Sequence, residues 1–257
     1  MKHLQEPLLY LMFFSAMWNA QSFVERQQQR QQCYSIGSST GRSTGRSTGR
    51  STGRSRYSKA ESRLYSSSTR SKDDVRFLGR GPNAIVRPGC VLLAPSEEYH
   101  HYLRQAAVFI YAMGTDDNDD YVVRGVILDN PTPFSMGEMM ESKIYGGVYD
   151  NLIYRGGDTG GEDAFCLHSI DNLGLEEIGT SNLYQGGDLQ KIADPSKVKF
   201  FFNYMEFLEQ ELEDMLEITH EDGDGWISVE VPPEMVLDTD YDKGDAWRYL
   251  RNAIRGM

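Results

Sequence analysis

The apolar residues of this 257-residue chain gather in short runs from residue 87 onwards, and each run is bounded by glycine, proline or acidic turns. Short apolar runs between such turn signals predict buried β-strands. We therefore expect strands in the segments 87–95 (RPGCVLLAP), 106–113 (AAVFIYAM), 121–133 (YVVRGVILDNPTP), 152–154 (LIY), 164–170 (AFCLHSI), 181–184 (SNLY), 197–204 (KVKFFFNY) and 225–231 (GWISVEV). The two prolines of the third segment are expected to close its strand.

Two later segments instead repeat apolar residues at helical spacing. They are 205–217, with Phe207, Leu208, Leu212, Met215 and Leu216, and 243–254, with Trp247, Leu250 and Ile254 on one face. Shorter helices are expected at 96–106, where Ser96 can cap the first turn, near 136–141, and between 185 and 194. Because strands and short helices mix without regular alternation, the pattern predicts an α+β fold.

Charge divides the chain into two unlike parts. Residues 1–72 hold 12 lysines and arginines against three acidic residues, which leaves 14 basic and 35 acidic residues for 73–257. The net charges are therefore +9 and −21, and the acidic part would repel a phosphate backbone, so we expect no direct nucleic-acid binding.

Cys90 and Cys166 of this part lie in apolar runs and are expected to be buried free thiols.

The first 72 residues have the composition of a targeting segment. An apolar run from Pro7 to Trp18 follows one lysine and is too short to span a bilayer, which is typical of a signal peptide over residues 1–22. Residues 23–72 are basic, rich in serine, contain four STGR repeats and are expected to be disordered. A signal peptide followed by a transit peptide resembles the bipartite plastid-targeting presequence of algae with secondary plastids, with Ala20-Gln21-Ser22-Phe23 at the junction.

That resemblance implies that the presequence is removed and that the mature protein lies in the plastid stroma, without a membrane segment. The alternative is a basic arm that binds RNA, but the STGR repeats lack the aromatic residues that stack on bases.

Three polar clusters of the acidic part could bind metal ions or phosphate, and each has a simpler explanation. HEDGDGWISVE resembles a calcium loop but has His220 and Val231 where the first carboxylate and the bidentate acid belong. DDNDD (116–120) is expected to be a solvated turn, with loose cation binding as the alternative. RGGDTGG lacks the spacing of a phosphate loop. We expect no metal, no cofactor and no catalytic residue.

Several segments between about Arg87 and Met257 form an ordered set, namely GCVLLAP (89–95), YLRQAAVFI (102–110), GVILDNP (125–131), RGGD followed by CLHS, and the residues Trp226, Pro232, Leu237 and Trp247. Taken in this order, they resemble the AlgH/YqgE family. This resemblance implies a single compact domain over residues 80–257, with a mixed, mostly antiparallel and strongly curved sheet flanked by short helices. The sequence departs from the family pattern in two places. Asp158 replaces a proline. The stretch NYMEFLEQELE (203–213) keeps Tyr204 but has other residues in place of the family's glycines and tryptophan, and these residues favour a helix extended toward its N-terminus.

The resemblance leaves the biochemical role open, because the family's own role is poorly defined. Our leading hypothesis is a non-enzymatic protein that acts through protein partners or regulation. The alternative is a small-molecule-binding or hydrolytic protein with a pocket near Asn130, Asp158 and His168. Convergence of these three side chains would favour that pocket, whereas bonds from His168 to the backbone would oppose it. The candidate ligand or partner surface comprises Asn130, Pro131, Gly156, Gly157, Asp158, His168 and Tyr204.

Overall fold

The computed structural model of the chain describes residues 74–116, 118–139, 148–173, 175–188, 192, 194–220 and 223–255. All of them belong to one unit, Ser58–Met257. The signal peptide predicted at 1–22 and the transit peptide at 23–72 lie outside the described residues and stay predictions.

The described residues form ten strands joined in one sheet. The path runs β1-β10-β2-β3-β4-β9-β6-β5, and β7 joins it through β9 and carries β8. Every strand pair is antiparallel except β6 with β9, so the predicted mixed, mostly antiparallel sheet is confirmed, while its strong curvature stays a prediction. The strands are β1 (Arg76–Arg80), β2 (Cys90–Leu93), β3 (Ala107–Thr115), β4 (Tyr121–Ile127), β5 (Pro131–Ser135), β6 (Leu152–Arg155), β7 (Thr159–His168), β8 (Tyr184–Gln185), β9 (Val198–Leu208) and β10 (Ile227–Glu230).

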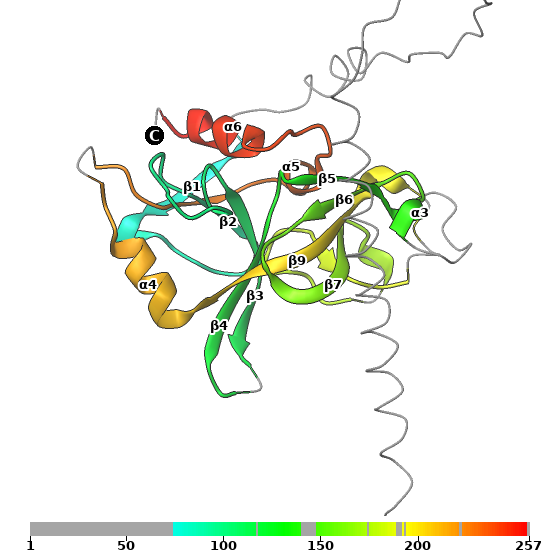
Figure 1. The fold of residues 1–257 in the computed structure, drawn as a ribbon, viewed down its shortest axis with the longest axis horizontal. Coiled ribbons are helices and arrows are strands. Elements are labelled where there is room, and N and C mark those ends of the chain that lie inside the picture. The colour runs from blue at the N-terminus through cyan, green and yellow to red at the C-terminus, as the bar shows by residue number, and fades with distance from the viewer. Residues whose placement is uncertain are drawn as a thin grey trace, which may run out of the picture. The chain divides into compact units, whose positions relative to one another are not determined.

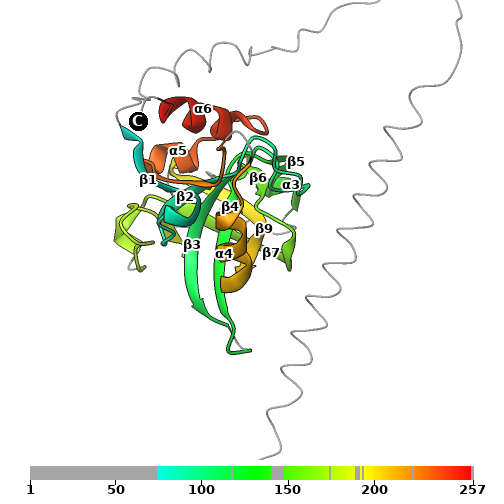
Figure 2. The ribbon, with the colours of Figure 1, turned by 90° about the vertical axis from the view of Figure 1, so that its left-hand side faces the viewer.

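Four short α-helices accompany the sheet in the described part of the chain. They are α3 (Met136–Met139), α4 (Glu209–Glu217), α5 (Pro233–Leu237) and α6 (Asp245–Ala253), and three 3-10 turns cover Gly81–Asn83, Asp171–Leu173 and Pro195–Lys197. Helices α5 and α6 lie next to each other at one end of the domain, and the β3–β4 hairpin projects from the other end (Figures 1 and 2). The mixture of strands and short helices confirms the α+β prediction.

Both faces of the central strands are buried. Along β2, Val91 and Leu93 belong to the apolar cluster that includes α5 and α6, whereas Cys90 and Leu92 belong to the cluster that includes Leu212 of α4. A strand covered on both faces has no need of polar residues at alternate positions. This explains why the sequence shows continuous apolar runs instead of strict alternation.

Strand β9 holds the two halves of the sheet together. Its first part pairs with β6 and β7, and its end, from Met205 to Leu208, pairs with β4. Between these parts Asn203 adopts a left-handed backbone with φ of 58°. The chain after β6 crosses β9 so closely there that a Cβ atom on Gly157 would stand 2.1 Å from the carbonyl oxygen of Tyr204. Glycine is therefore required at this crossing.

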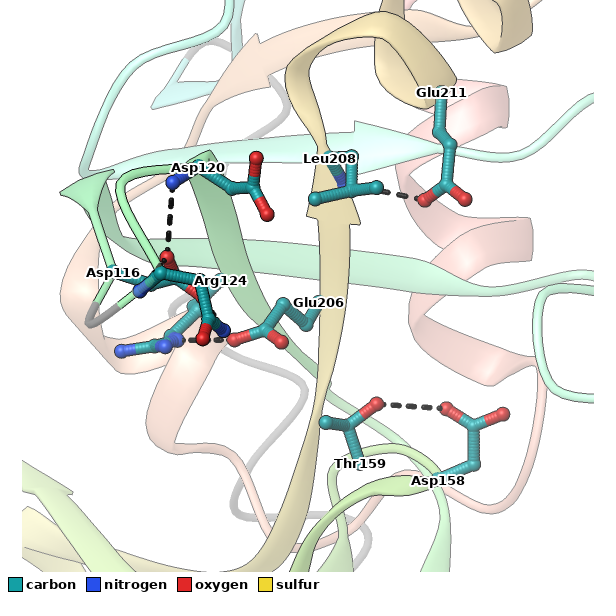
Figure 3. A network of polar contacts seen from close by, with 9 residues as sticks. Asp116, Asp120, Arg124, Asp158, Thr159, Glu206, Leu208 and Glu211 are labelled. Atoms are coloured by element: carbon teal, nitrogen blue, oxygen red, sulfur yellow. Dashed lines mark hydrogen bonds and ion pairs between the residues drawn. The ribbon is translucent and has the colours of Figure 1, made fainter.

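Two helix predictions are wrong. The segment 96–106 forms turns, because the Ser96 amide donates to the carboxylate of Asp224 (2.7 Å) and Gln105 has a φ of 53°. The segment 205–208 continues β9, so α4 begins only at Glu209, where Glu211 accepts a hydrogen bond from the Leu208 amide (3.2 Å; Figure 3). The predicted extension of this helix toward the N-terminus is therefore also wrong.

The prolines of two segments begin elements that the sequence pattern did not predict. Pro131 opens the edge strand β5, although it was expected to close the preceding strand, and Pro233 lies in the first turn of α5, for which the sequence pattern gave no prediction. An edge strand and a helix start both tolerate a residue without an N–H group.

Candidate functional site

A cavity of about 490 Å³ lies between α6, the end of β1 and the segments around Ser96 and Asp224. Its apolar lining comes from the buried residues Ile227, Trp247 and Ile254. The polar lining contains four arginines and is made of Arg80, Ser96, Asp224, Arg248, Arg251, Asn252 and Arg255. We call this the arginine-lined cavity.

The local structure explains why these arginines meet. Arg248, Arg251 and Arg255 are spaced three and four residues apart along α6 and its C-terminal end, so they share one helix face. The same helix is fixed to the domain by Trp247, whose indole Nε1 donates to the carbonyl oxygen of Ala94 (2.7 Å). Arg80 reaches the cavity from the end of β1, where it pairs with Ile227 of β10.

Arg251 is a fixed part of the wall. Its guanidinium forms an ion pair with Asp224 and donates to the carbonyl oxygens of Ala94 and Gly225, and the side chains of Arg251 and Asp224 are only 11% and 14% exposed. Burial by itself would raise the pKa of Asp224, but the hydrogen bonds from Arg251 and Ser96 lower it below the usual value. Asp224 therefore stays ionised and neutralises Arg251.

The other three arginines are more available to a bound ligand. Arg248 is 54% exposed and pairs with Asp245 on its own helix. Arg80 and Arg255 are exposed, and neither has an ion pair or a side-chain hydrogen bond to another described residue. With four arginines and one aspartate the lining carries a formal charge of +3, in a part of the chain whose net charge is −21. Such a local reversal of charge attracts anions at short range.

The predicted surface residues occupy several different places, and none of them lines this cavity. Gly156, Gly157 and Tyr204 do meet, at the crossing with β9. Tyr204 also packs edge-on against Tyr111, with ring centroids 6.3 Å apart, and lies beneath the guanidinium of Arg124. This contact of backbone and rings is tightly packed, so it serves the fold.

The strand-end residues of the predicted surface have local roles. Asn130 accepts a hydrogen bond from the Arg155 amide through its backbone carbonyl (2.8 Å), and Pro131 pairs with Tyr154 at the start of β5. Asp158 is exposed and accepts a hydrogen bond from Thr159 (3.5 Å; Figure 3).

His168 is fully buried and bonded to the backbone at both ring nitrogens. Its Nδ1 accepts from the Ile170 amide (3.2 Å), so Nε2 carries the proton and donates to the carbonyl oxygen of Gly186 (3.0 Å). Burial lowers the pKa of His168, against the opposite effect of the Gly186 carbonyl. Tyr184 stacks on the ring, with centroids 5.7 Å apart. This is the geometry of a structural histidine, and no hydrogen bond joins it to Asn130 or Asp158 among the described contacts.

Sequence reasoning missed two buried charges, Lys199 and Asp129. The Lys199 ammonium donates to the carbonyl oxygens of Asp238 (2.6 Å) and Val236 (3.3 Å) and lies 4.1 Å from the centre of the Tyr154 ring. Asp129 accepts from the Ala246 amide at the start of α6 (2.9 Å). The available signal was a lysine and an aspartate inside or directly after apolar runs, KVKFFF and GVILD.

Burial dominates the protonation of both groups. It lowers the pKa of Lys199 to about 7, although Asp129 acts in the opposite direction. It raises the pKa of Asp129 to about 6, against the hydrogen bond from Ala246 and the charge of Lys199. Asp129 caps α6, which together with its C-terminal end carries three of the cavity's arginines, so it helps to hold these arginines in place.

The two cysteines and the acidic segment 116–120 also have clear positions in the structure. Cys90 and Cys166 are buried and free, as predicted, and burial raises the pKa of Cys166 to about 11. The described residues of 116–120 form a turn in which Asp116 accepts from the amides of Asn118 and Asp120 (Figure 3). The described residues contain no group of side chains suited to a metal ion, and none of their helices is long and apolar enough to span a bilayer.

Comparison with known proteins places the domain in a family. Residues 92–256 match the sequence model of a family described as AlgH-like. A crystal structure of a protein from Corynebacterium diphtheriae is similar in fold, with a TM-score of 0.52 and 17% identity over 68% of this chain and 89% of that chain. The solution structure of the AlgH protein from Pseudomonas aeruginosa aligns with a TM-score of 0.47 and 15% identity, over 65% of this chain and 87% of that one. No curated protein matches the chain. Because the family match covers more than half of its length, the chain belongs to the AlgH-like family.

Proposed function

We propose that this AlgH-like protein acts without catalysis, by binding an anionic group of a partner in the arginine-lined cavity. One observation carries the proposal: Arg80 of β1 and three arginines of α6 and its end meet at one cavity of an otherwise acidic domain. Guanidinium groups are the side chains best suited to bind carboxylates and phosphates. A cluster of them drawn from two distant segments is therefore a recognition site for an anion.

The proposal of a non-enzymatic role is supported by the state of the reactive side chains. Cys166 has a raised pKa and is buried, so little thiolate is present near neutral pH. Both nitrogens of His168 are already used in hydrogen bonds to the backbone. Neither side chain is available as a nucleophile or a base.

The test of partner binding uses two exposed arginines. In the doubly substituted chain R80Q/R255Q, we expect loss of the proteins that the wild-type chain retains from a plastid extract, because the cavity then carries only about one positive charge. R104Q is the matched control, since Arg104 is also exposed but lies outside the cavity. Equal retention by the wild type, R104Q and R80Q/R255Q would contradict the proposal.

We further propose that the protein works in the plastid stroma after removal of a bipartite presequence. The support is the signal-like run at 1–22, the basic serine-rich segment 23–72 and the Ala20-Gln21-Ser22-Phe23 junction. A fluorescent reporter fused to residues 1–72 is expected in the plastid of an alga with a secondary plastid. A reporter fused to residues 23–72 alone is expected to stay in the cytosol. Secretion or cytosolic retention of the 1–72 fusion would overturn this proposal.

The alternative of a ligand pocket near Asn130, Asp158 and His168 has no comparable support. His168 is buried and bonded to the backbone, and Asp158 is exposed and bonded to its neighbour. No observation in this part of the fold favours a hydrolytic function.

A further inference from the structure

We infer that the anionic group bound by the arginine-lined cavity is a phosphate monoester on an organic body. The inference rests on the proposed function and specifies its ligand. Three properties of the cavity carry it, namely its charge, the directions from which its polar groups come, and its size together with its apolar lining.

The charge of the lining favours a dianion. Arg251 is neutralised by Asp224, whereas Arg80, Arg248 and Arg255 contribute positive charge that no side chain of the lining neutralises. Arg248 does have a partner, Asp245, but the pair is exposed and joins neighbouring turns of one helix. Exposed pairs of this kind are weak, so Arg248 can exchange Asp245 for a ligand. A phosphate monoester carries close to two negative charges near neutral pH, whereas a carboxylate carries one.

The arginines that the lining does not neutralise come from two directions. Arg80 comes from β1, whereas Arg248 and Arg255 come from α6 and its end. A phosphate presents three acceptor oxygens arranged around one centre, so it can accept from donors on different sides at once. A planar carboxylate is best matched by a single guanidinium in a bidentate contact.

The volume and the apolar lining indicate an organic body. A volume of about 490 Å³ lies within the range of pockets for small organic ligands. Inorganic phosphate would leave most of this space to water. Ile227, Trp247 and Ile254 offer apolar contacts beside the arginines, which suits a molecule with a phosphate at one end and a less polar body.

The competing explanation is that the arginines only complement the C-terminal end of α6. Cations near a helix C-terminus stabilise it through the helix dipole. This accounts for Arg251 and Arg255, but Arg80 comes from β1 and is not part of the helix, so helix stabilisation alone does not explain its place in the lining.

In the experiment, the full chain is titrated with phenyl phosphate at pH 8. Binding is measured by isothermal calorimetry and by the ³¹P line width of the ligand. Phenyl sulfate is the matched probe, because it has nearly the same shape and one negative charge fewer, and inorganic phosphate tests the need for an organic body. We expect phenyl phosphate to bind about tenfold more tightly than either, a difference that one extra charge-assisted contact would supply.

Substitutions then connect binding to the cavity. R80Q/R255Q is expected to weaken phenyl phosphate binding about tenfold or more, while R104Q leaves it unchanged. Thermal unfolding of R80Q/R255Q should match the wild type, because both arginines are exposed and have no ion pair in the described part of the domain. Equal binding of phenyl phosphate and phenyl sulfate, or binding that R80Q/R255Q does not change, would overturn the inference.

The same titration separates failure of the phosphate inference from failure of the proposed function. If benzoate or an acidic peptide binds with dependence on Arg80 and Arg255 while phenyl phosphate does not, the phosphate inference fails and the proposed function stands. If none of these anions binds and R80Q/R255Q also retains the captured partners, both fail.

Discussion

The environment of Lys199 differs strongly from the aqueous surroundings of a free lysine side chain. Its ammonium is enclosed by the domain and is stabilised by two carbonyl oxygens at the end of α5 and by the face of Tyr154. Burying a charge costs free energy even when hydrogen bonds satisfy it. The hydrogen bonds from this lysine hold the chain that connects α5 to α6. The free-energy cost of burying its charge therefore accompanies the fixed position of α6.

The buried lysine makes stability depend on pH. The pKa of Lys199 is about 7 in the folded domain and 10.5 in a free side chain, so between these values the unfolded chain binds more protons. The free energy of unfolding should therefore rise as the pH increases from about 7 to about 9. Asp129, with its pKa raised from 3.8 to about 6, has the opposite effect at lower pH, and its contribution falls as the pH rises from 3.8 to 6.

K199M tests this prediction through urea unfolding at several pH values. The substitution removes the titrating group, so the rise between about pH 7 and pH 9 should flatten. K197M is the control, because Lys197 lies two residues away and is exposed, and it should keep the wild-type slope. A slope in K199M equal to that of the wild type would show that Lys199 does not titrate in this range.

His168 gives a second prediction at the residue scale. H168A leaves the Gly186 carbonyl and the Ile170 amide without their partners, so it should lower the free energy of unfolding by about 3 kcal/mol. Binding of phenyl phosphate to the folded protein should not change. H101A, at an exposed position, should leave both quantities unaltered. Lost binding in a folded H168A protein would return His168 to the list of ligand-binding residues.

At the scale of elements, sequence patterns predicted the strands that combine apolar runs with clear turn signals. The segments that contain β2, β3 and β10 were found because their apolar residues are contiguous. Strand β1 (RFLGR) was missed because it lies at the sheet edge and has few apolar residues. The end of β9 was mistaken for helix, although the alternate burial of Met205 and Phe207 is the pattern of a strand. Pairing with β4 decided its structure, and a local pattern carries no information about that pairing.

The crossing of β9 by the chain after β6 gives a prediction for an element pair. G157A should lower the free energy of unfolding by about 3 kcal/mol, because the new Cβ would stand 2.1 Å from the carbonyl oxygen of Tyr204 and would force the two backbones apart. G114A is the matched control, since a Cβ at Gly114 meets nothing within 4 Å. Chemical denaturation of both variants measures the difference. Equal stability of G157A and G114A would mean that the two backbones can move apart at this crossing and accept a Cβ atom.

At the scale of the whole molecule, the functional site was less predictable than the fold. The arginine-lined cavity joins Arg80 to Arg255, which lie near opposite ends of the domain's sequence, and only the pairing of β1 with β10 brings them together. The helical spacing of Arg248, Arg251 and Arg255 was visible in WRYLRNAIR. That signal alone predicts a polar helix face and does not identify a cavity.

The division of the chain gives a prediction for the whole molecule. All described residues belong to the unit Ser58–Met257, so a chain that begins at Ser58 should unfold within about 1 °C of the full chain. Differential scanning calorimetry of the two chains measures this. A midpoint lowered by about 5 °C or more would show that the first 57 residues contribute to the stability of the domain.

The pairing of β1 with β10 also sets the order in which the domain can assemble. Strand β10 lies between β1 and β2, so the first strand finds its place only after residues 227–230 are available. The β3–β4 hairpin joins segments close in sequence and can form early, whereas contacts between distant segments form slowly. Until then the edge of β2 that β10 will cover is open to strands of other chains. A chain that emerges N-terminus first from a ribosome or a translocation pore therefore completes its fold only when nearly all of it is out, and we expect it to depend on chaperones during that interval.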